Sequence, residues 1–264
     1  MNRELPVGFF DSGVGGLSVY ARFKELLPNE NTIYFGDLKN MPYGNKTKDE
    51  LIGFAKKILD FYNAKNVKAV IIACNTSSAV AYEELKNDYD FKIYPIIQMC
   101  AEKVACLGLK TVGVFATAAT INSNAYKNEL KKYAPDINVV QVACPNWTTW
   151  VEAGMQESAE ARADISEKVA DMIVNKPDKI ILGCTHYPYL MNVLKDYTDE
   201  NIFLDPAIIF SNAIKDDLTK LNLINISHAK GNEKFYVSAN PQAFVKNSKQ
   251  FYSVPDELVL QVNI

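Results

Sequence analysis

The chain has few of the residues and segments that mark special classes of protein. Its 264 residues contain only two histidines, and its five cysteines include no Cys-x-x-Cys pair. An odd number of irregularly spaced cysteines does not suit a disulfide framework and favours reduced thiols in a cytoplasmic protein. No apolar run approaches the roughly 18 residues that a membrane span needs. The N-terminal segment also lacks the apolar stretch of a signal peptide.

The charge composition is similarly unspecialised. The formal net charge is −3, so nothing indicates binding to nucleic acid or to an anionic membrane. Apolar residues make up 48% of the chain, which is ample for a packed core. This length suits one large domain or two medium ones.

Strand-like apolar runs alternate with helical patterns along the chain. This alternation predicts an α/β fold with mostly parallel sheets. We expect strands at residues 6–10, 32–36, 68–73, 92–96, 111–115, 137–142, 179–183 and 202–205. We expect helices at residues 15–27, 47–63, 77–87, 98–107, 122–133, 157–174, 188–196 and 207–220. The tail from Lys230 predicts closing strands and a helix packed on the first half of the molecule.

Two cysteines are the most informative residues, because each lies where an apolar strand runs into a helix. Cys74 ends the run 69–74, and Cys184 ends the run 179–184. The carboxyl ends of parallel strands are where α/β proteins bind ligands, and a helix start favours a thiolate. The sequence therefore predicts two acid/base groups that face one substrate from opposite sides.

A faint internal repeat supports two similar lobes. Residues 8–12, GFFDS, resemble residues 113–117, GVFAT, and the two strand-end cysteines follow at similar intervals. Chance similarity between two βα units is the alternative explanation. Two α/β lobes that face each other across a cleft are the architecture we expect.

The glycine-rich loop at residues 13–16 allows two interpretations. It follows a strand and opens a helix, as a dinucleotide-binding loop does, and Asp37 mimics the acidic residue that binds the ribose. However, Ser18 replaces the third glycine, and Asp11 would lie near an anionic pyrophosphate. The alternative is a tight loop whose backbone N–H groups reach a small anion such as a carboxylate.

Asp11 and His186 are candidate proton-handling partners of the two thiols. Asp11 follows an apolar strand, where it is either a helix cap or a partner of Cys74. His186 lies two residues beyond Cys184 and is either structural or a proton-transfer group. Zinc binding would have only three soft ligands at unusual spacing. Cys–His nucleophilic catalysis would leave one strand-end cysteine unexplained.

Several ordered motifs resemble those of the cofactor-independent glutamate racemases, within the aspartate/glutamate racemase superfamily. The resemblance covers nearly the whole chain. The motifs are residues 10–16, 34–37, 42–46, 73–76, 119–121, 151–154 and 182–188.

The resemblance implies two pseudo-symmetric α/β lobes, here residues 1–97 plus 207–264 and residues 98–206, with the substrate between them. It implies interconversion of L- and D-glutamate without cofactor or metal, supplying D-glutamate for peptidoglycan, in a homodimer. By motif match, the two bases would be Cys74 and Cys184, assisted by Asp11, Glu152 and His186. The implied substrate-binding residues are Asp11, Ser12, Pro42, Tyr43, Gly44, Asn75, Thr76, Thr117, Thr120, Thr185 and His186.

Two departures from the family pattern affect what we expect of specificity. Residues 144–150, CPNWTTW, lack the usual apolar stretch before Glu152, and Ala116 replaces a common glycine. Trp147 and Trp150 share one face if their segment is helical, where they would border the cleft, contact a partner subunit or pack in the core. An aspartate or broader amino-acid racemase and a non-catalytic anion-binding protein stay open as alternatives.

Overall fold

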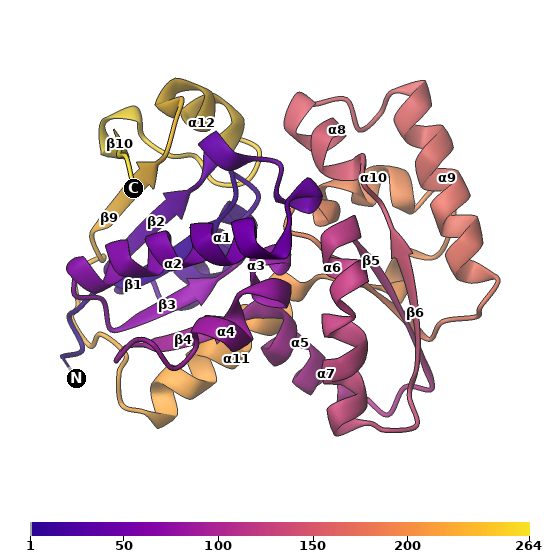
Figure 1. The fold of residues 1–264 in the computed structure, drawn as a ribbon, viewed down its shortest axis with the longest axis horizontal. Helices are drawn as coiled ribbons and strands as arrows, with labels where there is room; N and C mark the ends of the chain where they lie inside the picture. The colour runs from indigo at the N-terminus through magenta and orange to yellow at the C-terminus, as the bar shows by residue number, and fades with distance from the viewer. Residues whose placement is uncertain (1) are drawn as a thin grey trace.

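The computed structural model describes residues 2–264 and contains two parallel sheets side by side (Figure 1). The first sheet has the strand order β10-β9-β2-β1-β3-β4, and the second has the order β6-β5-β7-β8. The first sheet consists of β1 (Val7–Asp11), β2 (Thr32–Gly36), β3 (Ala69–Ile72), β4 (Lys92–Pro95), β9 (Glu233–Val237) and β10 (Val259–Gln261). The second consists of β5 (Thr111–Ala116), β6 (Asn138–Ala143), β7 (Lys179–Gly183) and β8 (Phe203–Leu204).

The two sheets repeat one pattern of strands, which confirms the expected α/β architecture. The order β2-β1-β3-β4 in the first sheet corresponds to β6-β5-β7-β8 in the second. All pairings are parallel. The strands β1 and β5 are almost entirely buried, as strands covered on both faces by helices must be. The repeat therefore places β3 and β7, which lead into the two cysteines, at equivalent positions.

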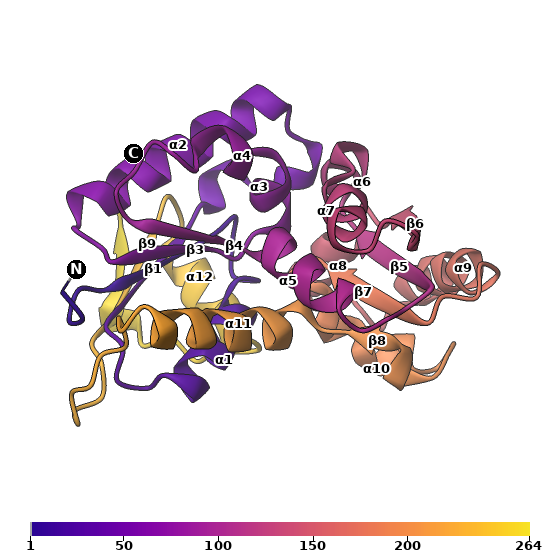
Figure 2. The same ribbon diagram turned by 90° about the horizontal axis from the view of Figure 1, so that it is seen from below.

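Helices cover both faces of the sheets, as the parallel strand connections require. In Figure 2, α2 and α4 lie on one side of the first sheet, while α1 and α11 lie on the other. The helices of the first half are α1 (Leu17–Leu26), α2 (Lys48–Ala64), α3 (Asn75–Val80), α4 (Tyr82–Leu85) and α5 (Ile96–Ala105). The others are α6 (Ala118–Ser123), α7 (Ala125–Tyr133), α8 (Trp147–Ala153), α9 (Ala159–Ile173), α10 (Met191–Leu194), α11 (Pro206–Lys220) and α12 (Pro241–Ser248).

Short 3₁₀ turns and helix breaks account for the differences from the predicted elements. The predicted helix at 122–133 is two helices, α6 and α7, because Asn124 adopts the left-handed conformation between them. The predicted helix at 188–196 is a 3₁₀ turn, η3 (Tyr187–Leu190), followed by α10. The helix α8 was not predicted, and α9 begins after it at a Ser158 cap. Another 3₁₀ turn, η2 (Tyr43–Asn45), precedes α2.

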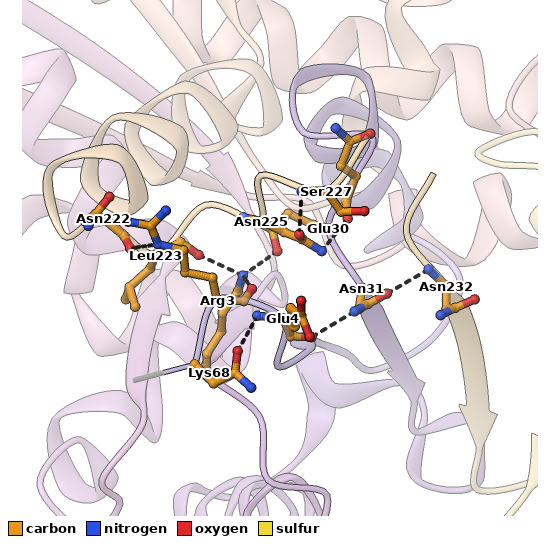
Figure 3. Close-up of polar contacts among 12 residues, drawn as sticks. Arg3, Glu4, Glu30, Asn31, Lys68, Asn222, Leu223, Asn225, Ser227 and Asn232 are labelled. Atoms are coloured by element: carbon orange, nitrogen blue, oxygen red, sulfur yellow. Dashed lines mark hydrogen bonds and ion pairs between the residues drawn. The ribbon is translucent and has the colours of Figure 1, made fainter. Parts of the chain in front are cut away.

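The chain returns to the first sheet through α11 and closes there with β9, α12 and β10, as the tail pattern predicts. Figure 3 shows the polar cluster that holds this return in place. Lys68, just before β3, is fully buried and forms an ion pair with Glu30. Its ammonium also donates to the carbonyls of Arg3 and Leu223, at 2.6 and 2.8 Å. The Asn225 backbone N–H donates to the other Glu30 oxygen at 2.8 Å.

This cluster lies at the amino ends of the first-sheet strands, so it is remote from the end where the cysteines lie. It ties the segment before β1 to the connection between α11 and β9. Among residues 2–264, no helix is both long enough and apolar enough to cross a bilayer.

Candidate active site

The carboxyl ends of β1, β3, β5 and β7 converge on one cavity of about 150 Å³ between the two sheets. This small space suits a small metabolite. Its lining includes the predicted residues Ser12, Pro42, Tyr43, Gly44, Cys74, Asn75, Thr76, Thr117, Cys184, Thr185 and His186. Asp11, Thr120 and Glu152 are not in the lining and lie behind it.

Cys74 is the residue that precedes α3, and it enters the cavity from the first sheet. Its side chain is 95% buried, and burial together with the nearby Asp11 charge raises the pKa of this thiol to about 12. Hydrogen bonds from Ser77 oppose this rise in pKa. Without a ligand, Cys74 is therefore protonated at neutral pH.

Asp11 ends β1 and lies fully buried behind the cavity. Burial raises the pKa of its carboxyl to about 6, against a smaller lowering by the charge of His186. The Gly13 N–H donates to Oδ1 at 3.1 Å, and the Thr185 hydroxyl donates to Oδ2 at 3.5 Å. Asp11 thus contacts Thr185, which follows the second sheet. Its charge also raises the pKa of Cys74, the partner that the sequence predicts.

Cys184, His186 and Glu152 form a relay on the opposite side of the cavity. The Cys184 sulfur lies 3.7 Å from Nδ1 of His186, whose Nε2 lies 2.7 Å from Oε1 of Glu152. Burial opposes protonation of the imidazole, but its contacts with Cys184 and Glu152 outweigh this and raise the pKa of His186 to about 10. A protonated imidazole beside the sulfur stabilises a thiolate.

Thr148 is a site residue that the sequence analysis missed. It lies in the first turn of α8, and its Oγ1 is 3.5 Å from the Cys184 sulfur. Thr148 and Glu152 are four residues apart, so both face the same side of the helix. The signal was present in the unusual segment before Glu152, but helical register alone did not reveal a contact with a cysteine far along the chain.

A second group of side chains presents hydrogen-bonding groups to the cavity. The Tyr126 hydroxyl donates to Oδ1 of Asn75 at 2.7 Å, while Nδ2 of Asn75 is buried without a protein partner within residues 2–264. Asn75 therefore has a free donor at the cavity. The hydroxyls of Thr76 and Thr117 lie 3.0 Å apart and join the two sides, and Thr120 supports both from behind.

The glycine-rich loop serves close packing between segments. A Cβ at Gly15 would clash with the His186 ring and the Thr185 hydroxyl, and one at Gly13 would clash with Met41. Asp37 accepts hydrogen bonds from Asn40 and, at 2.6 Å, from the Tyr43 hydroxyl. The loop and Asp37 are thus already used by the protein itself, which removes the basis for a dinucleotide site.

A sequence model of the Asp/Glu/hydantoin racemase family matches residues 10–212. The chain belongs to this racemase family. It is 39% identical to a glutamate racemase of Thermoanaerobacter sp. (strain X514) over 261 residues, which is 98% of this chain and 97% of the relative.

Solved structures of racemases have the same fold as this family member. The glutamate racemase of Francisella tularensis subsp. tularensis SCHU S4, in complex with D-glutamate, aligns with a TM-score of 0.92 at 32% identity, over 99% of this chain and 98% of that one. The Thermus thermophilus enzyme, in complex with β-chloro-D-alanine, aligns with a TM-score of 0.90 at 30% identity, over 100% and 99%.

The two tryptophans of this racemase do not line the cavity. Trp147 is fully buried against Phe115 and Tyr187, with ring centroids 5.0 Å apart in both pairs. Its indole N–H donates to Asp164 at 2.8 Å, and Trp150 packs partly buried against the same core. Trp147 therefore packs in the core, as one of the three interpretations of this segment expects. The adjacent Thr148 is the residue of the segment that contacts Cys184.

Proposed function

We propose that this racemase interconverts L- and D-glutamate with its two cysteines as the bases. The observation that carries the proposal is that both sulfur-bearing residues line one small cavity from opposite sheets. The glutamate racemases of Thermoanaerobacter and Francisella, the latter in complex with D-glutamate, support glutamate as the substrate. D-Glutamate made in this way would supply peptidoglycan synthesis in the cytoplasm.

In the proposed reaction, one thiolate removes the α-proton and the opposite thiol donates a proton to the other face of the carbanion. The C–H bond breaks on one side, a new C–H bond forms on the other, and the two sulfurs exchange protonation states. No net oxidation occurs, so the step needs no co-reactant. His186 and Glu152 would stabilise the Cys184 thiolate, and Asp11 would influence Cys74.

The remaining polar side chains would hold the substrate. We assign the α-amino and α-carboxylate groups to Ser12, Asn75, Thr76 and Thr185, because hydroxyl and amide donors stabilise charge that develops on the carboxylate in the carbanion. The free Nδ2 of Asn75 supports this assignment. We assign the rest of the ligand to Pro42, Tyr43, Gly44 and Thr117, with Thr120 as a support of Thr117 and Thr76.

We also propose a division into two lobes, residues 1–97 plus 207–264 and residues 98–206. Each proposed lobe contains one whole sheet, which supports these bounds. We expect the protein to act as a homodimer, as the resemblance to the glutamate racemases implies. An analytical ultracentrifugation run at several concentrations tests this expectation directly.

Racemisation of purified L-glutamate, followed by circular dichroism without added cofactor, tests the proposed function. We expect the signal to decay to zero, and we expect aspartate to react much more slowly. Faster decay with aspartate would favour the aspartate racemase alternative. A constant signal with both amino acids, despite saturable glutamate binding, would favour a binding protein.

A further inference from the structure

The Thr148 hydroxyl has one proton to donate, and the structure limits where it can go. A helical threonine often donates to the carbonyl four residues earlier, which here is that of Cys144. That carbonyl already accepts from the Tyr187 hydroxyl at 2.7 Å and from the Trp147 N–H at 3.4 Å. With both lone pairs of that carbonyl engaged, two acceptors remain near the Thr148 hydroxyl: the Tyr187 oxygen, whose own proton goes to the Cys144 carbonyl, and the Cys184 sulfur, 3.5 Å away. An ionised sulfur competes for the proton better than a neutral phenol oxygen, because hydrogen bonds to ionised acceptors are stronger.

We propose that Thr148 is a positioning residue that donates a hydrogen bond to the Cys184 sulfur and so makes Cys184 the resting thiolate. This inference rests on the proposed function, and it assigns the starting protonation state of the two bases. A thiolate has no proton, so the hydroxyl must be the donor when Cys184 is ionised. Hydrogen bonds to ionised acceptors are roughly twice as strong as neutral ones.

The two thiols have opposite surroundings, which supports the assignment. Cys74 faces the carboxylate of Asp11, and together with burial this raises the pKa of Cys74 to about 12. Cys184 faces the imidazole of His186 and the Thr148 hydroxyl. Two titratable groups reach Cys184 indirectly: Glu152 contacts His186, and Asp11 contacts Thr185. The other titratable groups around Cys184 are His186, Tyr187, Cys144, Tyr126 and Cys74.

Loss of the Thr148 hydrogen bond should change the pH dependence of kcat/KM without favouring either direction of racemisation. L- and D-glutamate have equal free energies in water, so kcat/KM must be equal in the two directions for every variant. Loss of the Thr148 hydrogen bond therefore cannot favour one enantiomer at equilibrium. We expect it to move the acid limb of the kcat/KM profile to higher pH by the same amount in both directions.

Alkylation of the substrate-free protein with iodoacetamide, resolved by peptide mass spectrometry, tests the proposal. The reagent reacts with thiolates, and we expect Cys184 to react before Cys74 at pH 7. In Thr148→Val, which keeps the shape and removes the hydroxyl, we expect Cys184 to react about tenfold more slowly, as loss of one hydrogen bond to a charged group implies. At high pH, where both proteins hold a thiolate, the rates should converge, which excludes a change in access.

Two further variants provide the controls. Thr148→Ser keeps the hydroxyl and should react within about twofold of the native rate. Thr149→Val removes a hydroxyl from the adjacent residue, which is exposed and also lines the cavity, and it should leave the Cys184 profile unchanged. A native-like rate in Thr148→Val would overturn the proposal, and so would a rate in Thr148→Ser as low as that in Thr148→Val.

The alkylation test and the racemisation test can fail separately. If the native protein racemises glutamate but Cys184 reacts independently of Thr148, the inference alone is wrong. If no amino acid is racemised while the Thr148 dependence holds, the proposed function is wrong and the hydrogen bond still stands.

Discussion

At the scale of single residues, neighbours distinguish two chemically identical thiols. Cys74 has a buried carboxylate beside it, whereas Cys184 has an imidazole and a hydroxyl. The sequence was sufficient to predict which cysteines lie at the cavity, because each follows a strand. It could not predict Thr148, whose contact with Cys184 depends on how α8 packs beside β7.

The first prediction concerns the division of work between the thiols. Cys74→Ser and Cys184→Ser should each lower racemisation by at least roughly 10²-fold, because a hydroxyl is a far poorer base near neutral pH. Each variant should still exchange the α-proton of one enantiomer with solvent, which NMR in D₂O measures. Cys184→Ser, in which Cys74 is intact, should exchange D-glutamate. Cys74→Ser, in which Cys184 is intact, should exchange L-glutamate. Exchange of the same enantiomer in both variants would refute the opposite-face assignment.

The second prediction follows from the buried carboxyl of Asp11. Burial raises the pKa of this carboxyl from an ordinary value of 3.8 to about 6 in the folded protein, so the folded state gains stability from this group as the pH falls through 6 toward 3.8. At pH 8 the ionised form destabilises the fold, by up to roughly 3 kcal/mol at 1.36 kcal/mol per pH unit. We therefore expect Asp11→Asn to unfold at a higher temperature than the native protein at pH 8.

Calorimetry at pH 8 and pH 5 checks this sign. The advantage of Asp11→Asn should shrink at pH 5, while its turnover should be reduced at both pH values. Asp60→Asn is the matched control, since hydrogen bonds from Lys56 help to lower the pKa of that exposed carboxyl. A stability gain for Asp11→Asn that grows on acidification would contradict the account.

At the scale of elements, strands and their ends were predictable, and loops and helix breaks were less so. The apolar runs predicted all strands of the second sheet to within a few residues. The glycine-rich loop was harder, because its glycines make room for His186, Thr185 and Met41 from distant segments. The local sequence shows where the glycines are, but it does not show which distant side chains pack against them.

The third prediction tests that reading of the loop. Gly15→Ala should place a methyl group against His186 and Thr185 and displace both, and displacement of catalytic groups by about 1 Å can cost 10²-fold in rate. Gly53→Ala is the control, because a Cβ there meets no atom of residues 2–264 within 4 Å and the residue lies in α2. It should keep full activity and gain slightly in stability. Equal turnover of the two variants would contradict this role of Gly15.

At the scale of the whole molecule, the chain must return from the second sheet to complete the first. The buried pair Lys68–Glu30 links the N-terminal segment, β3 and the loop after α11 at the end remote from the cavity (Figure 3). The repeated strand order was suggested by the sequence. This cluster was not, because its members lie far apart along the chain.

The fourth prediction measures what this cluster contributes. Lys68→Met leaves Glu30 buried without its cation and should lower the free energy of unfolding by about 3–5 kcal/mol. Lys56→Met removes a cation from an exposed pair with Asp60 and should have little effect. Urea denaturation of the three proteins makes the comparison, and similar midpoints for both variants would show that the cluster is not a stabilising link.

The central claim is that two thiols on opposite sides of one cavity exchange the α-proton. The most direct measurement is racemisation of L-glutamate in D₂O, stopped at low conversion and analysed by mass spectrometry of each enantiomer. The D-glutamate should carry deuterium at Cα, because the opposite thiol delivers a solvent-derived hydron, while the unreacted L-glutamate remains protiated. D-Glutamate that retains its original α-hydrogen would show that a single base removes and returns it, and would contradict the account.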